Sequence, residues 1–322
     1  MAPPGAEEVL YTFSALSLVS SSMILLSYYL FIDIREKMYI KLVFFEAICS
    51  FFVSISGCLG LHTERNASCY IQAILSNYFQ LASIFWCVIM LYGLYSSVVL
   101  QNSPISNFKN FHMFCWGIPL IATFLHLTTN TFGPISPGEA DWCFIVSTSS
   151  SPNWLDVFWV IATIYFWWFS SIVAMVYFYV TVVWRLNMLE NPALSKNVNI
   201  ALEKLKYYPI ILVSCWICTA YGDIVDSAYP NEKNYNDGVY FCAIVLPQLC
   251  GLLNAAAFFS SNSNVAQLWY VFITEDLLSP ERYATSIEFS KNPMTSEEIV
   301  LDKSYTPPKL SEEQRDKNTG TV

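Results

Sequence analysis

The residues of this chain that could do chemistry are scattered along the sequence. Its three histidines, His62, His112 and His126, lie in different segments. Cys215 and Cys218 have the spacing of a redox or metal-binding pair, but they lie inside a long apolar stretch without a histidine. We therefore expect both cysteines to pack as small hydrophobic groups. The sequence predicts no metal site, no cofactor and no nucleophile–base arrangement, which argues against an enzyme.

Long apolar stretches dominate the chain and define its class. Hydrophobic residues make up 55% of it and charged residues 13%, which is outside the range of ordinary soluble domains. A helix needs about 20 mostly apolar residues to cross the hydrocarbon core. Because these runs are continuous and do not alternate, a strand barrel is excluded. The sequence predicts an all-α membrane protein, a bundle of seven transmembrane helices at 9–32, 40–61, 70–100, 113–130, 157–186, 207–228 and 239–259.

Lysine and arginine predict the orientation of this bundle. They concentrate in alternate loops, whereas the opposite loops contain only Arg65 and Lys233. Basic loops face the cytosol. We therefore expect a multi-pass protein of the cell membrane, with residues 1–8 extracellular and the carboxyl end cytoplasmic. The cytosolic side would offer a basic surface to a protein partner or to anionic lipid, and topology alone would also produce it: Arg35, Lys37, Lys109, Arg185, Lys196, Lys204 and Lys206.

Two cysteines, Cys69 and Cys143, are the only ones that fall outside the apolar stretches. The predicted topology places both in an oxidising exterior, where unpaired cysteines are uncommon. We expect a bond between them, and two unrelated thiols are the alternative. Asn66-Ala67-Ser68 lies on the same side and reads as a glycosylation acceptor, although its position near the membrane would hinder the transferase.

Polar residues inside the spans mark the interior of the bundle, because they are costly in lipid. Glu46, Ser50, Ser54 and Gly57 follow helical spacing in the second span. In the third span a similar small-polar stripe consists of Ser76, Gln80, Ser83 and Cys87. We interpret Glu46 as part of a conformational lock with a polar group on a neighbouring helix, for example Lys206. A carboxylate that reaches the membrane surface is the alternative.

Prolines interrupt the backbone hydrogen bonds of three spans. We expect Pro119 to be a static packing feature. Pro209 in the sixth span and Pro247 in the seventh are predicted hinges. Residues near these hinges form the rest of the predicted switch: Trp216, Gln248 and Asn254, with Gly251 on the face of Pro247.

The predicted outer half of the bundle is rich in aromatic and acidic residues. Membrane-interface belts explain many of the aromatic residues. Acidic residues greatly outnumber basic ones on this side, so the field should attract cations and repel anions. We predict a ligand site for a cationic or neutral molecule, formed by Trp86, Trp142, Asp156, Tyr221, Asp223, Asp226 and Tyr240.

The segment after the seventh span changes character twice. Residues 260–273 place Val265, Leu268, Trp269 and Phe272 at helical spacing, which predicts a short amphipathic helix on the inner leaflet. Residues 274–322 are charged, rich in Ser and Thr, and poor in aromatic residues, so we expect a disordered cytoplasmic tail. Its hydroxyl groups could be phosphorylated and bind kinase or arrestin-like partners, or the tail could have no regulatory role.

An ordered set of short motifs resembles one receptor family. The set comprises Cys69-Tyr70-Ile71-Gln72, Phe85-Trp86, Trp142-Cys143-Phe144-Ile145, Tyr208-Pro209, Cys215-Trp216, and Pro247 with Gly251-Leu252-Leu253-Asn254. It is similar to the cyclic-AMP-receptor-like G-protein-coupled receptors of slime moulds, a group related to the secretin-like receptors. The resemblance implies ligand-driven nucleotide exchange on a heterotrimeric G protein. It also implies a bridge between Cys69 and Cys143, a seventh-span motif role for Asn254 and a second-span role for Glu46.

Two features depart from what receptor families would suggest. The third span ends in Tyr92-Gly93-Leu94-Tyr95 and lacks the acidic-arginine-aromatic triplet of rhodopsin-like receptors. The acidic exterior suits a cyclic nucleotide badly, since its phosphate would find only Arg65 and Lys233. We therefore predict that cyclic AMP is not the ligand.

Other functions remain as alternatives. A retinal protein would need a seventh-span lysine, and residues 239–259 contain none. A proton- or cation-coupled transporter or channel is the stronger rival, because Glu46, His126, Asp223 and Asp226 could form an ion path. Against it, the chain has no evident internal repeat or pair of broken helices. No nucleic-acid partner is predicted.

Overall fold

The computed structural model describes most of the predicted bundle. It describes residues 5–35, 37–100, 108–135, 141–146, 158, 160–188, 205, 207–228 and 237–276. For residues 6, 33, 222–228, 237, 239, 240, 263, 275 and 276 the description covers the backbone only. The predicted tail beyond residue 276 lies outside the described residues.

Seven membrane-spanning elements follow one another along the chain. Within the described residues, five helices are long and apolar enough to cross a membrane. The shorter apolar helix at Tyr207–Tyr221 is the sixth element in chain order, and a pair of helices bent by 40° is the seventh. The predicted fold class is confirmed. The helices are α1 (Ala6–Leu30), α2 (Ile32–Arg35), α3 (Met38–Gly57), α4 (Ala67–Val98), α5 (Phe108–Thr128), η2 (Ile161–Tyr165) leading into α7 (Phe166–Asn187), α9 (Tyr207–Ala228), the bent pair α10 (Asp237–Gln248) and α11 (Cys250–Ser261), and α12 (Ser263–Val271) leading into η3 (Phe272–Asp276).

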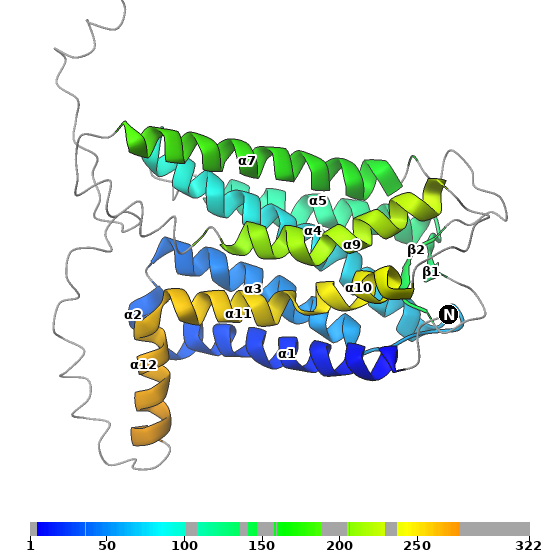
Figure 1. Cartoon of the computed structure of the whole chain (residues 1–322), viewed down its shortest axis with the longest axis horizontal. Coiled ribbons are helices and arrows are strands. Elements are labelled where there is room, and N and C mark those ends of the chain that lie inside the picture. Colours follow the sequence, from blue (N-terminus) through cyan, green and yellow to red (C-terminus); the bar gives the residue numbers. More distant parts are fainter. Residues whose placement is uncertain are drawn as a thin grey trace, which may run out of the picture.

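Helix α4 is the centre of the bundle. It contacts α3, α5, α7 and α9, and most of its length is buried. Figure 1 shows the long helices side by side, with α1, α3 and α11 on one flank and α5 and α7 on the other. Helices α5 and α7 expose large apolar side chains such as Leu120, Phe124, Val173 and Trp184, as expected of surfaces that face lipid.

A short hairpin and a disulfide mark one end of the bundle. Strand β1 (Phe132–Pro134) pairs antiparallel with β2 (Cys143–Ile145). Cys143 is bonded to Cys69 in the first turn of α4, with 5.3 Å between their Cα atoms. The predicted pairing is therefore confirmed. We call this the disulfide end; the start of α1 lies there too (Figure 1).

Helix α12 crosses the opposite end of the bundle, roughly perpendicular to the long helices (Figure 1). The chain turns at Asn262, whose Nδ2 donates to the carbonyl of Phe258 (2.9 Å) while its Oδ1 accepts from the Tyr39 hydroxyl (3.0 Å). Trp269 Nε1 then donates to Ser27 Oγ on α1 (2.7 Å). These bonds hold α12 in the orientation of a helix that lies on a membrane surface. We call this the α12 end.

Candidate ligand-binding site

A cavity opens among the helices in the half of the bundle nearer the disulfide end. It comprises about 480 Å³ of space, including its open mouth. Its walls come from α4, β2, η2 with α7, and α9: Asn77, Gln80, Leu81, Ile84, Phe144, Ile164, Tyr165, Trp168, Trp216, Thr219 and Ala220.

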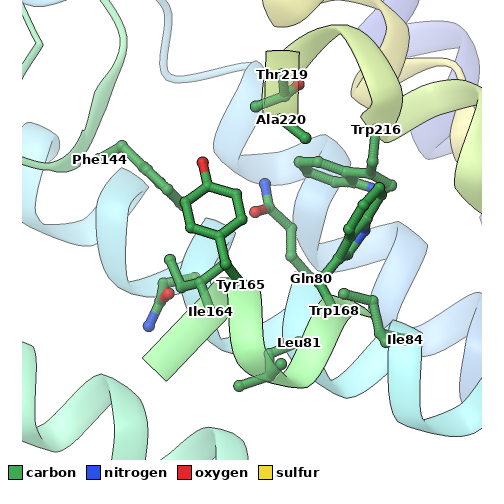
Figure 2. A pocket seen from close by; sticks show the side chains of 11 residues that line it. Gln80, Leu81, Ile84, Phe144, Ile164, Tyr165, Trp168, Trp216, Thr219 and Ala220 are labelled. Atoms are coloured by element: carbon green, nitrogen blue, oxygen red, sulfur yellow. The ribbon is translucent and has the colours of Figure 1, made fainter. Parts of the chain in front are cut away.

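Aromatic rings and amides give this cavity its chemistry. Figure 2 shows the Gln80 amide pointing between Tyr165 on one side and the two indoles of Trp168 and Trp216 on the other. Asn77 is already engaged, because its Nδ2 donates to Thr123 Oγ1 on α5 (2.9 Å). Among the described residues, Gln80 has no hydrogen-bond partner and the lining contains no charged side chain.

Strand β2, with Trp142 before it, covers the cavity at the disulfide end, and we call this segment the roof. It is fixed to the bundle by Gln72, which is fully buried on α4. Its Nε2 donates to the carbonyls of Ser56 (3.0 Å) and Gly60 (2.7 Å), and its Oε1 accepts from the backbone N–H of Cys143 (3.0 Å). One side chain thus ties the end of α3 to strand β2. The next residue of that strand, Phe144, lines the cavity.

The loop between α3 and α4 closes over the same end. The backbones of His62 and Asp141 exchange two hydrogen bonds (2.8 and 3.0 Å). Burial lowers the pKa of His62 below its usual value, and the nearby Glu7 opposes that shift only partly, so the imidazole is neutral at pH 7. Arg65 is also held on this surface: its Nη1 lies 3.5 Å from the carbonyl of Asn130, next to the hairpin and outside the cavity lining.

The described side chains of the predicted ligand set lie outside the cavity lining. Trp86 is fully buried and stacks on Phe45, with 4.6 Å between ring centroids, inside an aromatic cluster of α3, α4 and α5. Trp142 is buried in the roof, whereas Tyr221 is 57% exposed. Asp156 and the side chains of Asp223, Asp226 and Tyr240 lie outside the described residues. None of the described members lines the cavity, so this set stays a prediction.

Some of the cavity residues could have been found from the sequence. The polar stripe predicted on the third span includes Gln80, a residue of the cavity wall. The stripe begins one turn earlier, at Gln72, which the prediction did not include. Trp168 and Tyr165 had no such signal, because the fifth span is rich in aromatic residues throughout.

A second polar group of residues, which we call the polar seam, lies between α1, α3, α4 and the bent pair. Glu46 is 1% exposed, and its Oε1 accepts from Ser83 Oγ on α4 (2.7 Å) and Asn254 Nδ2 on α11 (3.2 Å). Ser50 contributes a weaker contact to the same oxygen (3.5 Å). Glu46 therefore has polar partners on two neighbouring helices, and its role as a conformational lock stays a prediction; Lys206 lies outside the described residues.

The seventh span bends where the sequence predicted a hinge. Pro247 lies in the last turn of α10, and α11 continues after the break. Gln248, beside it, accepts from Ser14 Oγ on α1 (3.3 Å). Gly251 lies so close to α1 that a Cβ there would collide with Ser17 and Ser21. In contrast, Pro209 lies near the start of α9 and is buried.

One residue connects the cavity to this bend. Thr219 lines the cavity, and its Oγ1 donates to the carbonyl of Ala243 on α10 (2.8 Å). Trp216, one turn earlier on α9, also lines the cavity and packs against the apolar core. A displacement of α9 would therefore also displace α10, through the hydrogen bond between Thr219 and Ala243.

Four residues of the predicted basic surface are described, and they lie at the α12 end. They are Arg35 at the end of α2, Lys37 before α3, Lys109 in the first turn of α5 and Arg185 in the last turn of α7. Arg35 is engaged within the chain, because its guanidinium donates to the carbonyls of Tyr28 and Tyr29 at the end of α1. Lys196, Lys204 and Lys206 lie outside the described residues.

Comparison with known proteins places the chain in one family. A profile described as slime mold cyclic AMP receptor matches residues 6–266. G-protein coupled receptor 1 of Arabidopsis thaliana is 26% identical over 287 residues, which cover 84% of this chain and 81% of that protein. Cyclic AMP receptor-like protein A of Dictyostelium discoideum is 22% identical over 253 residues, 78% of this chain and 63% of the relative.

A solved structure supports the fold independently. The crystal structure of squid rhodopsin superposes with a TM-score of 0.66 at 10% sequence identity, covering 91% of this chain and 92% of that chain. At this identity the likeness shows the fold alone. With the family profile matching most of the chain, the protein belongs to the slime mold cyclic AMP receptor family.

Proposed function

We propose that this protein is a G-protein-coupled receptor that binds a small extracellular ligand in the cavity and activates a heterotrimeric G protein at the α12 end. The observation that carries the proposal is the link from cavity to bend. Thr219 lines the cavity and is hydrogen-bonded to α10, and the bend after Pro247 leads to the polar seam around Glu46.

The proposed orientation follows from chemistry at the two ends. A disulfide requires an oxidising compartment, so the disulfide end faces outside. The described basic residues of the α12 end then face the cytosol, in agreement with the distribution rule for membrane proteins. There they would contact the G protein and anionic lipid, and the tail would meet kinases or arrestin-like proteins.

Asn66 is a proposed glycosylation site on the outer surface. It is exposed, and its Oδ1 caps α4 by accepting from the backbone N–H of Cys69 (2.8 Å). A glycan is attached to Nδ2, so the cap and the modification use different atoms of the same amide.

The proposed mechanism is a shift between two arrangements of the bent span. A ligand favours the active arrangement only by its difference in affinity for the two states. Contact with Trp216 and Thr219 would move α9 and α10, and the bend at Pro247 would then change how Asn254 meets Glu46. Those groups can form new pairs after a small displacement, because Glu46 Oε2 and Asn254 Oδ1 have no hydrogen-bond partner among the described residues.

The test is a ligand screen read out as nucleotide exchange, in cells that co-express this chain with a set of G-protein α subunits. We expect at least one ligand to stimulate exchange on at least one subunit. Currents or substrate uptake in reconstituted vesicles, without any exchange, would favour a transporter or channel and contradict the proposal.

A further inference from the structure

We propose that Cys218 on α9 and Cys242 on α10 are a modification site, at which a peroxide-class oxidant forms a second, reversible disulfide. The bond would cross-link two helices of the membrane-spanning bundle. This inference goes beyond the proposed function, because formation of the bond depends on the fold alone.

The structure gives each cysteine of the Cys215–Cys218 motif its own partner on the bent span. The Cys215 thiol is hydrogen-bonded to Cys250 on α11. The Cys218 thiol is hydrogen-bonded to Cys242 on α10. The spacing in the sequence suggested a pair within one helix, and we expected both cysteines to pack as small hydrophobic groups. The four thiols instead form two pairs between α9 and the bent span, and we call Cys218 with Cys242 the outer pair.

A hydrogen bond between the two helices fixes the position of the outer pair. Thr219 and Ala243 directly follow Cys218 and Cys242 in the sequence, and Thr219 Oγ1 donates to the carbonyl of Ala243 (2.8 Å). This bond holds α9 against α10 at the level of the two cysteines. A disulfide needs two sulfur atoms that can approach to about 2 Å. Two thiols that already share a hydrogen bond need only a small further approach.

Access distinguishes the outer pair from the other one. Cys215 and Cys250 are buried, whereas Cys218 and Cys242 are both partly exposed. Helix α10 begins at the disulfide end, and Cys242 lies in its first half (Figure 1). The susceptibility of a thiol to oxidation follows its exposure. An oxidant should therefore react with the outer pair before it reaches the buried one.

The reaction balances with hydrogen peroxide, a small uncharged oxidant. Peroxide transfers one oxygen atom to a cysteine sulfur, which becomes a sulfenic acid, and one water leaves. The second thiol attacks that sulfur, the S–S bond forms, and the sulfenic oxygen takes up the thiol proton and leaves as a second water. Two thiols and one peroxide thus give one disulfide and two waters. A dithiol such as dithiothreitol reverses the bond by exchange.

The disulfide would strengthen a link that now depends on one hydrogen bond. It would join α9 to α10 one residue before Thr219 and Ala243 in both helices. Oxidation should therefore hold the two helices together even when that hydrogen bond is removed. This consequence can be measured without any ligand.

The first test identifies the bond. The full chain in lipid nanodiscs is treated with hydrogen peroxide, then denatured and alkylated with N-ethylmaleimide, and its peptides are analysed by mass spectrometry without reductant. We expect peptides joined through Cys218 and Cys242, which dithiothreitol should separate. Cys218→Ser should remove the joined peptides, and Cys215→Ser, the matched control on the same helix, should keep them. The inference is overturned if peroxide leaves both outer thiols free to be alkylated, oxidises them to sulfinic acids without a bond, or joins Cys218 to Cys215.

The second test measures the link between the helices. Thr219→Val removes the hydrogen bond to Ala243 and should lower the unfolding temperature by about 2–4 °C. Peroxide should restore that loss in Thr219→Val, but not when Cys218→Ser is added. Joined peptides without any recovery would overturn the proposed restraint. Neither test uses a G protein, so a failed ligand screen would contradict the proposed function and leave the disulfide standing, whereas absence of the bond would do the reverse.

Discussion

The cavity and the polar seam are both polar regions inside an apolar bundle, yet they are constructed differently. The cavity leaves space, and its amide Gln80 has no partner among described residues. The seam leaves no space: a Cβ on Gly57 would collide with Ser14 and Gln248, and one on Gly251 with Ser17 and Ser21. Unpaired polar groups beside open space suit a ligand, whereas crowded polar groups with two possible pairings suit a switch.

The two regions also differ in how they are held. The cavity roof depends on a covalent bond and on Gln72, which joins α3 to β2. The seam depends on a few hydrogen bonds to Glu46 from α4 and α11. We therefore expect changes in the roof to affect stability most, and changes in the seam to affect both stability and the balance between states.

The largest expected effect comes from breaking the roof. Cys143→Ser removes the bond to Cys69, which should lower the free energy of unfolding by about 2–5 kcal/mol. The measurement is thermal unfolding of the purified protein. Cys58→Ser, at an exposed free thiol, is the matched control. Equal unfolding temperatures for the two variants would show that the disulfide does not hold the roof.

A smaller effect is expected from removing the acceptor in the seam. Glu46→Leu leaves the buried Ser83 hydroxyl without its acceptor and removes one acceptor of the Asn254 amide, which keeps its bond to Ser50 Oγ (3.3 Å). The loss should cost about 2–3 kcal/mol and alter basal nucleotide exchange. Glu46→Gln keeps an acceptor oxygen and should recover most of the stability. If Glu46→Leu unfolds like the unmodified chain, the seam is not a lock.

The smallest of the stability effects should come from crowding the seam. Gly251→Ala places a methyl group against Ser17, whose carbonyl oxygen would be 3.1 Å away, and we expect a loss of about 1–2 kcal/mol. Gly117→Ala on α5 is the control, because a Cβ there meets nothing within 4 Å. The measurement is again the unfolding temperature, and equal values for both alanine variants would contradict the close packing of α1 against α11.

Much of the scaffold was predictable because it depends on local sequence. Span ends predicted from hydropathy fall within about five residues of the observed helices. The position of Cys69 and Cys143 outside the spans favoured a bond between them, and the structure contains that bond. The bend after Pro247 follows from a missing backbone N–H.

The contacts within the sites were harder to predict because they depend on how helices rotate against one another. Helical spacing put Glu46 and Asn254 on interior faces, but it could not show that they meet. Trp86 was predicted to bind ligand, but its ring is buried and stacks on Phe45. In a chain so rich in aromatic residues, many of them pack in the core and do not line a site. Gln80 belonged to a recognised stripe, and only the packing of α7 and α9 around it made it a candidate contact.

The central claim is that the bend after Pro247 carries the signal from the cavity to the cytosolic face. The most direct measurement compares Pro247→Ala with Pro119→Ala, the proline inside α5, for ligand affinity and for nucleotide exchange stimulated by a ligand from the screen. Restoring one backbone hydrogen bond at the bend should bias it by about 1 kcal/mol or more. We predict normal expression of both variants, and exchange reduced about fivefold or more in Pro247→Ala only. Unchanged exchange in Pro247→Ala, with normal expression, would contradict the account.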